Sequence, residues 1–122
     1  MKIAILGSTG SIGNSTLEVI EKYPEKYQVV GLAAGDNAEL LQEQIRKFKP
    51  ETVSLSDDSG QDFLNVCSGT EVLYGVEGAC KVAAMPEADV VVAAISGSAG
   101  LLPTLEAVRL EKLLRLQIKN LW

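Results

Sequence analysis

Residues 2–13 read K-I-A-I-L-G-S-T-G-S-I-G, a short aliphatic run followed at once by a loop with glycine at every third position. From residue 11 to about residue 22, apolar side chains recur at helical spacing, and Pro24 follows the end of that run. A strand that passes through a glycine-rich turn into a helix is the context that a nucleotide-phosphate loop requires. This stretch predicts the start of a βαβ unit.

The alternation of strand and helix continues through the first half of the chain. Residues 27–34 form a second aliphatic run, and residues 37–48 have the periodicity of a helix that ends before Pro50. Residues 52–55 are a third short strand. Strands and helices that alternate with short links are typical of a doubly wound α/β fold. We expect a Rossmann-like, mainly parallel sheet with helices on both faces.

The second half carries weaker patterns. Residues 61–67 and 76–85 read as short helices on either side of a strand at 71–73, and residues 89–95 (D-V-V-V-A-A-I) read as a strong central strand. A glycine-bearing turn at 96–104 then leads into another helix. All of these elements fit into one α/β domain.

Composition limits the classes of function. Of the 122 residues, 47% are hydrophobic and 5% aromatic, so the core rests on aliphatic side chains, as in buried parallel strands. The formal net charge of −5 disfavours a nucleic-acid partner, and no run approaches the roughly 20 apolar residues of a membrane helix. Met1 directly precedes the first strand, so we expect no leader segment. With Cys67 and Cys80 as reduced thiols, we expect a cytoplasmic protein.

The sequence contains no histidine, which removes the commonest general acid–base group and the commonest metal ligand. The acidic pair Asp57-Asp58 lies in a Ser/Gly stretch and reads as a surface turn. We therefore assign no catalytic residue and no metal ligand within this chain.

The glycine loop carries the strongest functional signal. Backbone N–H groups at a helix N-terminus point at an anion, and the helix dipole favours the charge of a pyrophosphate. Gly7 would make the turn out of the strand, Gly10 would let the backbone approach phosphate, and Gly13 would let the helix pack closely. Thr9 and Ser11 add hydroxyl donors. The spacing is one residue wider than the G-x-G-x-x-G fingerprint, and a turn that serves packing alone is the alternative.

The segment Gly35-Asp36-Asn37 follows the second strand, where this fold contacts the adenosine ribose. An acidic residue there hydrogen-bonds a free 2′-hydroxyl and repels a 2′-phosphate, so Asp36 taken alone favours NAD over NADP. Asp36 with Glu39 also resembles a capping box for the helix that follows. The two interpretations are compatible.

A third glycine-bearing turn spans residues 94–100 and reads A-I-S-G-S-A-G. It follows the strand beyond the point where the strand order is expected to reverse, a position that commonly lines the nicotinamide side of such sites. An ordinary strand-to-helix turn explains its spacing slightly better.

Six blocks of this sequence recur in one enzyme family in the same order and spacing. They are I-A-I-L-G-S-T-G-S-I-G at 3–13, S-T-L at 15–17, V-G-L-A-A-G at 30–35, Asn37, D-V-V-V-A-A-I at 89–95 and G-L-L-P-T-L at 100–105. With these blocks the chain resembles the 1-deoxy-D-xylulose 5-phosphate reductoisomerase family. The resemblance implies the NADPH-binding domain of an enzyme that is both an isomerase and an oxidoreductase.

The family rearranges 1-deoxy-D-xylulose 5-phosphate and reduces the product to 2-C-methyl-D-erythritol 4-phosphate, in the methylerythritol phosphate pathway of isoprenoid biosynthesis. The resemblance implies NADPH, a divalent metal such as Mg²⁺ or Mn²⁺, a sugar phosphate substrate and a homodimer for the full-length enzyme. A stand-alone NAD-binding or redox-sensing module is the alternative function, and a product without any ligand is a third.

Carried over position by position, the resemblance implies two groups of cofactor-binding residues. They are Gly7, Thr9, Gly10, Ser11 and Ile12 at the pyrophosphate, and Gly35, Asp36 and Asn37 at the adenosine 2′-phosphate. Asp36 stands where the family often has a basic residue, which leaves the preference between NADPH and NADH open.

The sequence departs from the family after residue 109. There the family runs through a strand into an Ala-Asn-Lys-Glu-Ser-Leu block, whereas residues 117–122 read Q-I-K-N-L-W. The codons GCA AAT AAA GAA TCT TTG G encode that block, and read one base later they encode Gln-Ile-Lys-Asn-Leu-Trp. We interpret 1–109 as the NADPH-binding domain and 110–122 as a frameshifted, leucine-rich tail of helical character. The metal-binding and C-terminal parts of the enzyme are expected to be absent, and the fragment to be inactive alone.

Overall fold

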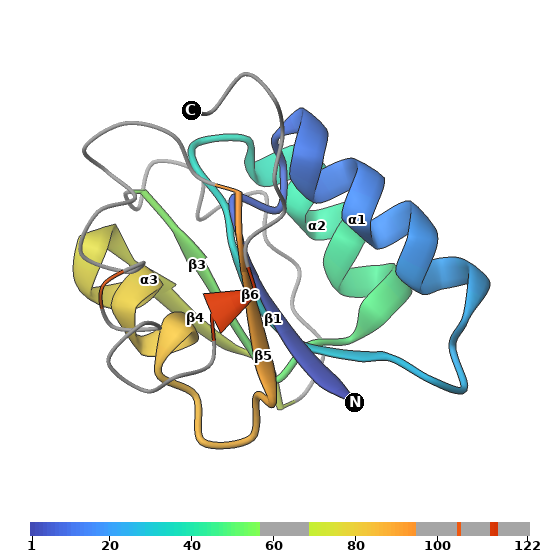
Figure 1. The fold of residues 1–122 in the computed structure, drawn as a ribbon. Coiled ribbons are helices and arrows are strands. Elements are labelled where there is room, and N and C mark those ends of the chain that lie inside the picture. The colour runs from blue at the N-terminus through green and yellow to red at the C-terminus, as the bar shows by residue number, and fades with distance from the viewer. Residues whose placement is uncertain (57–68, 95–104, 106–112, 115–122) are drawn as a thin grey trace, which may run out of the picture.

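The structure, a computed structural model, describes residues 1–56, 69–94, 105 and 113–114 (Figure 1). Helices and strands alternate along this chain in the following order. They are β1 (Lys2–Leu6), α1 (Ser11–Lys22), β2 (Gln28–Ala33), α2 (Ala38–Phe48), β3 (Thr52–Leu55), β4 (Glu71–Tyr74), α3 (Gly75–Ala83), β5 (Val90–Ala93) and β6 (Leu113–Leu114).

The strands of the described residues form one six-stranded sheet with the order β4-β3-β2-β1-β5-β6. Every neighbouring pair is parallel. The chain moves outward from β1 to β4 on one side and then returns to place β5 on the other side of β1, with Leu6 opposite Ala93. The strand order therefore reverses between β1 and β5, and open α/β sheets bind ligands beside such a point, at the carboxyl ends of the strands.

Helices cover both faces of the sheet (Figure 1), with α1 and α2 on one face and α3 on the other. Alternate side chains of β1 pack against the helices on the two faces of the sheet, because successive residues of a strand point to opposite faces. Ile3 and Ile5 pack in the core beneath α1 and α2, whereas Ala4 and Leu6 pack in the core beneath α3. The doubly wound, Rossmann-like arrangement expected from the sequence is confirmed.

Gly31 in β2 lets α3 approach the sheet closely. A Cβ atom at this position would lie 2.6 Å from the Met85 sulfur and 3.0 Å from Val82 Cγ1. Each of these buried side chains contributes about 1.5–3 kcal/mol by leaving water. The glycine that interrupts the aliphatic run of residues 27–34 is therefore part of the core.

Most predicted elements agree with the structure to within two residues. The bounds of β1, α1 and β3 are those expected, and β2 is one residue shorter at each end than the predicted 27–34. The strand predicted over 89–95 begins one residue later as β5, which ends at Ala93, so Ala94 lies outside the strand. Several predictions lie outside the described residues. They are the helix at 61–67 with Cys67, the pair Asp57-Asp58, and the turn at 96–104 with the helix after it.

The helical character expected after residue 110 is wrong where the structure describes this segment. Leu113 and Leu114 form β6, which pairs in parallel with β5 and places Leu113 opposite Val91. Without β6, β5 would present unpaired backbone groups at the sheet edge, and pairing there outweighs a local helical preference. The domain boundary at residue 109 stays a prediction. Among the described helices, none is long and apolar enough to cross a membrane.

Candidate dinucleotide-binding site

The glycine loop leaves β1 where the strand order reverses. Gly7 has φ +88°, in the left-handed region that strains any residue with a side chain. Its N–H donates to the Ala33 carbonyl at 2.7 Å, and the N–H of Ser8 donates to the same oxygen at 3.1 Å. The loop is thus fastened to the carboxyl end of β2, and Gly7 makes the turn that the sequence predicts.

Gly13 is required by packing. A Cβ atom there would lie 2.1 Å from the Gly7 carbonyl oxygen and 2.7 Å from Ser8 Cα, and backbone atoms cannot give way as a flexible side chain can. Gly10 differs, because a Cβ atom there would lie 3.5 Å from the Gly7 oxygen, an ordinary contact. Internal packing therefore explains Gly13 and leaves the exposed Gly10 available to a ligand.

Backbone N–H groups in the first turn of α1 have no acceptor within the part of the chain that the structure describes. Gly10 is the N-cap and supplies no side-chain hydrogen bond. Within the described part of the chain, the N–H groups of Ser11, Ile12 and Gly13 find no acceptor, and helical bonding begins with Asn14. The N–H of Thr9 is likewise without an acceptor among these residues. Such a group of donors at a helix N-terminus suits an anion.

The second predicted segment lies at the same edge of the sheet. Gly35 follows the end of β2, and its carbonyl accepts the N–H of Ser56 at 2.9 Å, just after β3. Ala94, the described residue of the third turn, donates its N–H to Leu6 at 2.8 Å. The carboxyl ends of β1, β2, β3 and β5 therefore bring together the glycine loop, the segment at residues 35–37 and Ala94, and the rest of the third segment lies outside the described residues.

The capping box predicted for Asp36 and Glu39 is wrong. Helix α2 begins at Ala38, a buried residue of the core, so the N-cap position falls on Asn37. Asn37 Oδ1 accepts the N–H of Leu40 at 3.1 Å. The carboxylate of Asp36 is exposed and makes no hydrogen bond or ion pair with any other described residue.

Sequence reasoning missed two residues beside the loop, Asn14 and Gln44. Gln44 is 4% exposed and donates a hydrogen bond to the Ser8 carbonyl at 2.8 Å. The sequence does point to a role for Gln44, because it is a polar residue on the apolar stripe of the helix predicted over residues 37–48. A buried polar side chain is hydrogen-bonded as a rule, and its partner is informative.

A cavity of about 390 Å³ lies away from this site, at the amino ends of the strands. Glu51, Glu71 and Lys81 line it near the start of β3 and β4. Among the described residues, no three Cys, Asp or Glu side chains are placed to hold a metal ion.

The sheet order and the loop together define the class of protein, a Rossmann-like domain of the dinucleotide-binding type. The family model for 1-deoxy-D-xylulose 5-phosphate reductoisomerase matches residues 3–120. The chain therefore belongs to the 1-deoxy-D-xylulose 5-phosphate reductoisomerase family, as the sequence blocks predicted.

Two curated relatives of that name show how much of the protein is covered. The one from Thermodesulfovibrio yellowstonii is 50% identical over 109 residues, which are 88% of this chain and 29% of the relative. The one from Chlorobium limicola is 48% identical over 121 residues, which are 97% of this chain and 32% of the relative. The chain spans about a third of the length of these relatives.

Solved structures of the family superpose on the same fold. The reductoisomerase from Zymomonas mobilis in complex with NADPH gives a TM-score of 0.85 at 35% identity, over 93% of this chain and 31% of that one. A reductoisomerase in complex with magnesium gives a TM-score of 0.82 at 34% identity, over 96% of this chain and 30% of that one.

Proposed function

We propose that this chain is the NADPH-binding part of a 1-deoxy-D-xylulose 5-phosphate reductoisomerase. The observation that carries the proposal is the row of N–H groups at the start of α1 that have no acceptor among the described residues, beside the point where the strand order reverses. Gly7, Thr9, Gly10, Ser11 and Ile12 would hold the pyrophosphate. When bound, NADPH supplies the hydride for the family's reduction, and these residues bind and orient it.

The adenosine 2′-phosphate would lie against Gly35, Asp36 and Asn37. Capping α2 uses the side-chain oxygen of Asn37, and its amide NH₂ has no partner among the described residues. A phosphate accepts hydrogen bonds from such a group. The Asp36 carboxylate opposes this preference. At an exposed site, two charges 4 Å apart repel by about 1 kcal/mol, and salt weakens this further. The NADPH complex of the Zymomonas relative supports NADPH as the cofactor.

The complete reaction is a proposal for a longer protein. It includes the sugar phosphate substrate, a divalent metal (Mg²⁺ or Mn²⁺), a homodimer and a cytoplasmic location. The described residues do not offer a group that fits the metal, so no step through a metal is assigned to them. The 122 residues alone are expected to bind cofactor without turning over substrate.

Calorimetric titration of the chain with NADPH and with NADH tests the proposal. We expect saturable binding of one NADPH per chain, tighter than that of NADH. Tighter binding of NADH would instead support a stand-alone NAD-binding or redox-sensing module, which the exposed carboxylate of Asp36 favours. Absence of binding by both would overturn the proposed function.

We also propose that residues 110–122 arise from a shifted reading frame. The coding DNA tests this directly. We expect an Ala-Asn-Lys-Glu-Ser-Leu block encoded one base away from the codons of residues 117–122, and its absence would contradict the frameshift.

A further inference from the structure

A loop that binds an anion must turn its N–H groups toward the ligand and its carbonyl oxygens away from it. In the glycine loop the carbonyl side is engaged within the protein. The Gly7 carbonyl accepts the N–H of Gly10 at 3.2 Å, and the Gly10 carbonyl accepts the backbone N–H of Asn14 at 2.9 Å. The two carbonyls between them, those of Ser8 and Thr9, accept from side chains instead.

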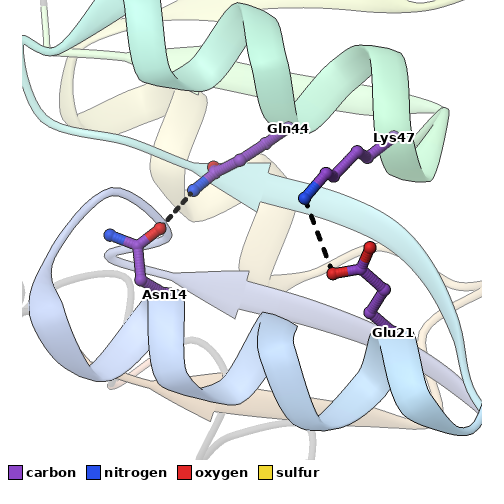
Figure 2. A network of polar contacts seen from close by, with 4 residues as sticks. All are labelled: Asn14, Glu21, Gln44 and Lys47. Carbon is purple, nitrogen blue, oxygen red and sulfur yellow. Dashed lines mark hydrogen bonds and ion pairs between the residues drawn. The ribbon is translucent and has the colours of Figure 1, made fainter.

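Two side-chain amides supply these donors, and Figure 2 shows them pointing toward each other from α1 and α2. Gln44 Nε2 donates to the Ser8 carbonyl at 2.8 Å and to Asn14 Oδ1 at 3.2 Å. Asn14 Nδ2 donates to the carbonyls of Thr9 at 3.3 Å and Gly10 at 3.1 Å. A chain of amides therefore runs from α2 to three consecutive carbonyls of the loop.

Both hydrogen bonds that the Gln44 side chain makes with described residues are donated by Nε2. Its Oε1 atom is buried without a partner among the described residues, and so is the Ser8 hydroxyl oxygen. An unpaired buried oxygen costs stability, whereas an aliphatic side chain would suit the buried stripe that Leu41 and Ile45 form on the same helix. The role of Gln44 therefore depends on its NH₂ group, which donates to the Ser8 carbonyl of the loop.

We propose that Gln44 and Asn14 are positioning residues for dinucleotide binding. Their amides hold the carbonyls of residues 8–10 within the protein, so that the N–H groups of Thr9 and residues 11–13 face the pyrophosphate. This inference rests on the proposed function, because it takes a dinucleotide as the ligand of the loop. It also links the two halves of the site, since α2 begins beside Asn37 and carries Gln44 two turns later.

The chain offers a matched control on the same two helices. Lys47 Nζ lies 3.6 Å from Glu21 Oε2, and both side chains are more than half exposed. Figure 2 shows this pair farther along α1 and α2 from the loop. Lys47→Leu therefore removes a polar contact between α1 and α2 and leaves the loop unchanged. Gln44→Leu instead removes the hydrogen bond from α2 to the Ser8 carbonyl of the loop.

The first test measures the affinity for NADPH and for adenosine 2′-monophosphate. It compares the wild-type chain with the variants Gln44→Leu, Gln44→Met and Lys47→Leu. The methionine variant has an unbranched side chain of similar length and serves if the leucine variant fails to fold. We expect the Gln44 variants to bind NADPH about tenfold more weakly, which is the effect of one buried hydrogen bond. Adenosine 2′-monophosphate has no pyrophosphate, and we expect its affinity to change by less than about twofold. An equal loss for both ligands would reduce Gln44 to a structural residue and overturn the proposal.

The second test needs no ligand. Amide hydrogen exchange followed by NMR reports whether the Gly10 N–H still donates to the Gly7 carbonyl in the free protein. We expect about tenfold faster exchange at Gly10 in the Gln44 variants and no change in Lys47→Leu. Unchanged exchange in all variants would overturn the positioning role. Failure of the wild-type chain to bind NADPH would overturn the proposed function instead, so the two failures are distinguishable.

Discussion

The two halves of the candidate site are built differently. The glycine loop is held by backbone geometry and by buried amides, with Gly13 packed against the Gly7 carbonyl and Gln44 bonded to Ser8. The segment Gly35-Asp36-Asn37 is exposed, and among the described residues its side chains make one hydrogen bond, from the Leu40 N–H to Asn37. The pyrophosphate half is thus preorganised, which lowers the cost of ordering it on binding. The 2′-phosphate half depends on exposed side chains that can change without disturbing the fold.

Gly13→Ala tests the rigid half with the largest expected effect. The added methyl group would overlap backbone, so we expect a loss of about 3 kcal/mol, seen as a fall in Tm of roughly 10 °C. NADPH binding should fall at least about 100-fold, because the loop and the first turn of α1 move apart. Gly10→Ala is the control, since its Cβ atom would have room. An equal fall in Tm for both variants would contradict the distinction between the two glycines.

Asp36→Lys tests the variable half. Replacing the carboxylate by an ammonium group removes a repulsion from the 2′-phosphate and adds an attraction, so NADPH affinity should rise about tenfold at low salt. NADH affinity should change much less, and raising the ionic strength should shrink the gain for NADPH. Titration calorimetry at two salt concentrations measures both effects. A similar change for the two cofactors would place Asp36 away from the 2′ position.

Asn37→Ser separates capping from ligand binding. Serine is also a good N-cap, so Tm should stay within about 2 °C of the wild-type value. The variant loses the amide NH₂, and NADPH affinity should fall about threefold while NADH affinity is retained. Asn37→Ala is the comparison that also loses the cap, at about 1 kcal/mol. If serine and alanine lowered Tm equally, Asn37 would not be the cap in solution.

Lys47→Leu has the smallest expected effect, because exposed ion pairs contribute only about 0.2–1 kcal/mol. We expect a change in Tm of at most about 4 °C and no change in NADPH affinity, measured by thermal unfolding and calorimetry. Weaker NADPH binding in this variant would show that the whole contact between α1 and α2, and not Gln44 in particular, controls the site.

Local sequence signals predicted the rigid half well. The glycine spacing identified the loop, and the apolar periodicity placed α1 at its observed bounds, because both depend on neighbouring residues. The sequence pattern places the cap of α2 at Asp36, one residue before the observed N-cap Asn37, because burial of Ala38 decides where that helix begins. The contacts of Gln44 with Ser8 and of β6 with β5 join residues far apart in the chain, so no local pattern could show them.

An NMR titration of the chain with NADPH, followed amide by amide, tests whether the glycine loop holds the pyrophosphate. We expect the largest shifts at the N–H groups of Thr9 and residues 11–13, with a second group at residues 35–37. Shifts confined to the cavity beside Glu51 and Lys81 at the amino ends of the strands, or no shifts at all, would contradict this expectation.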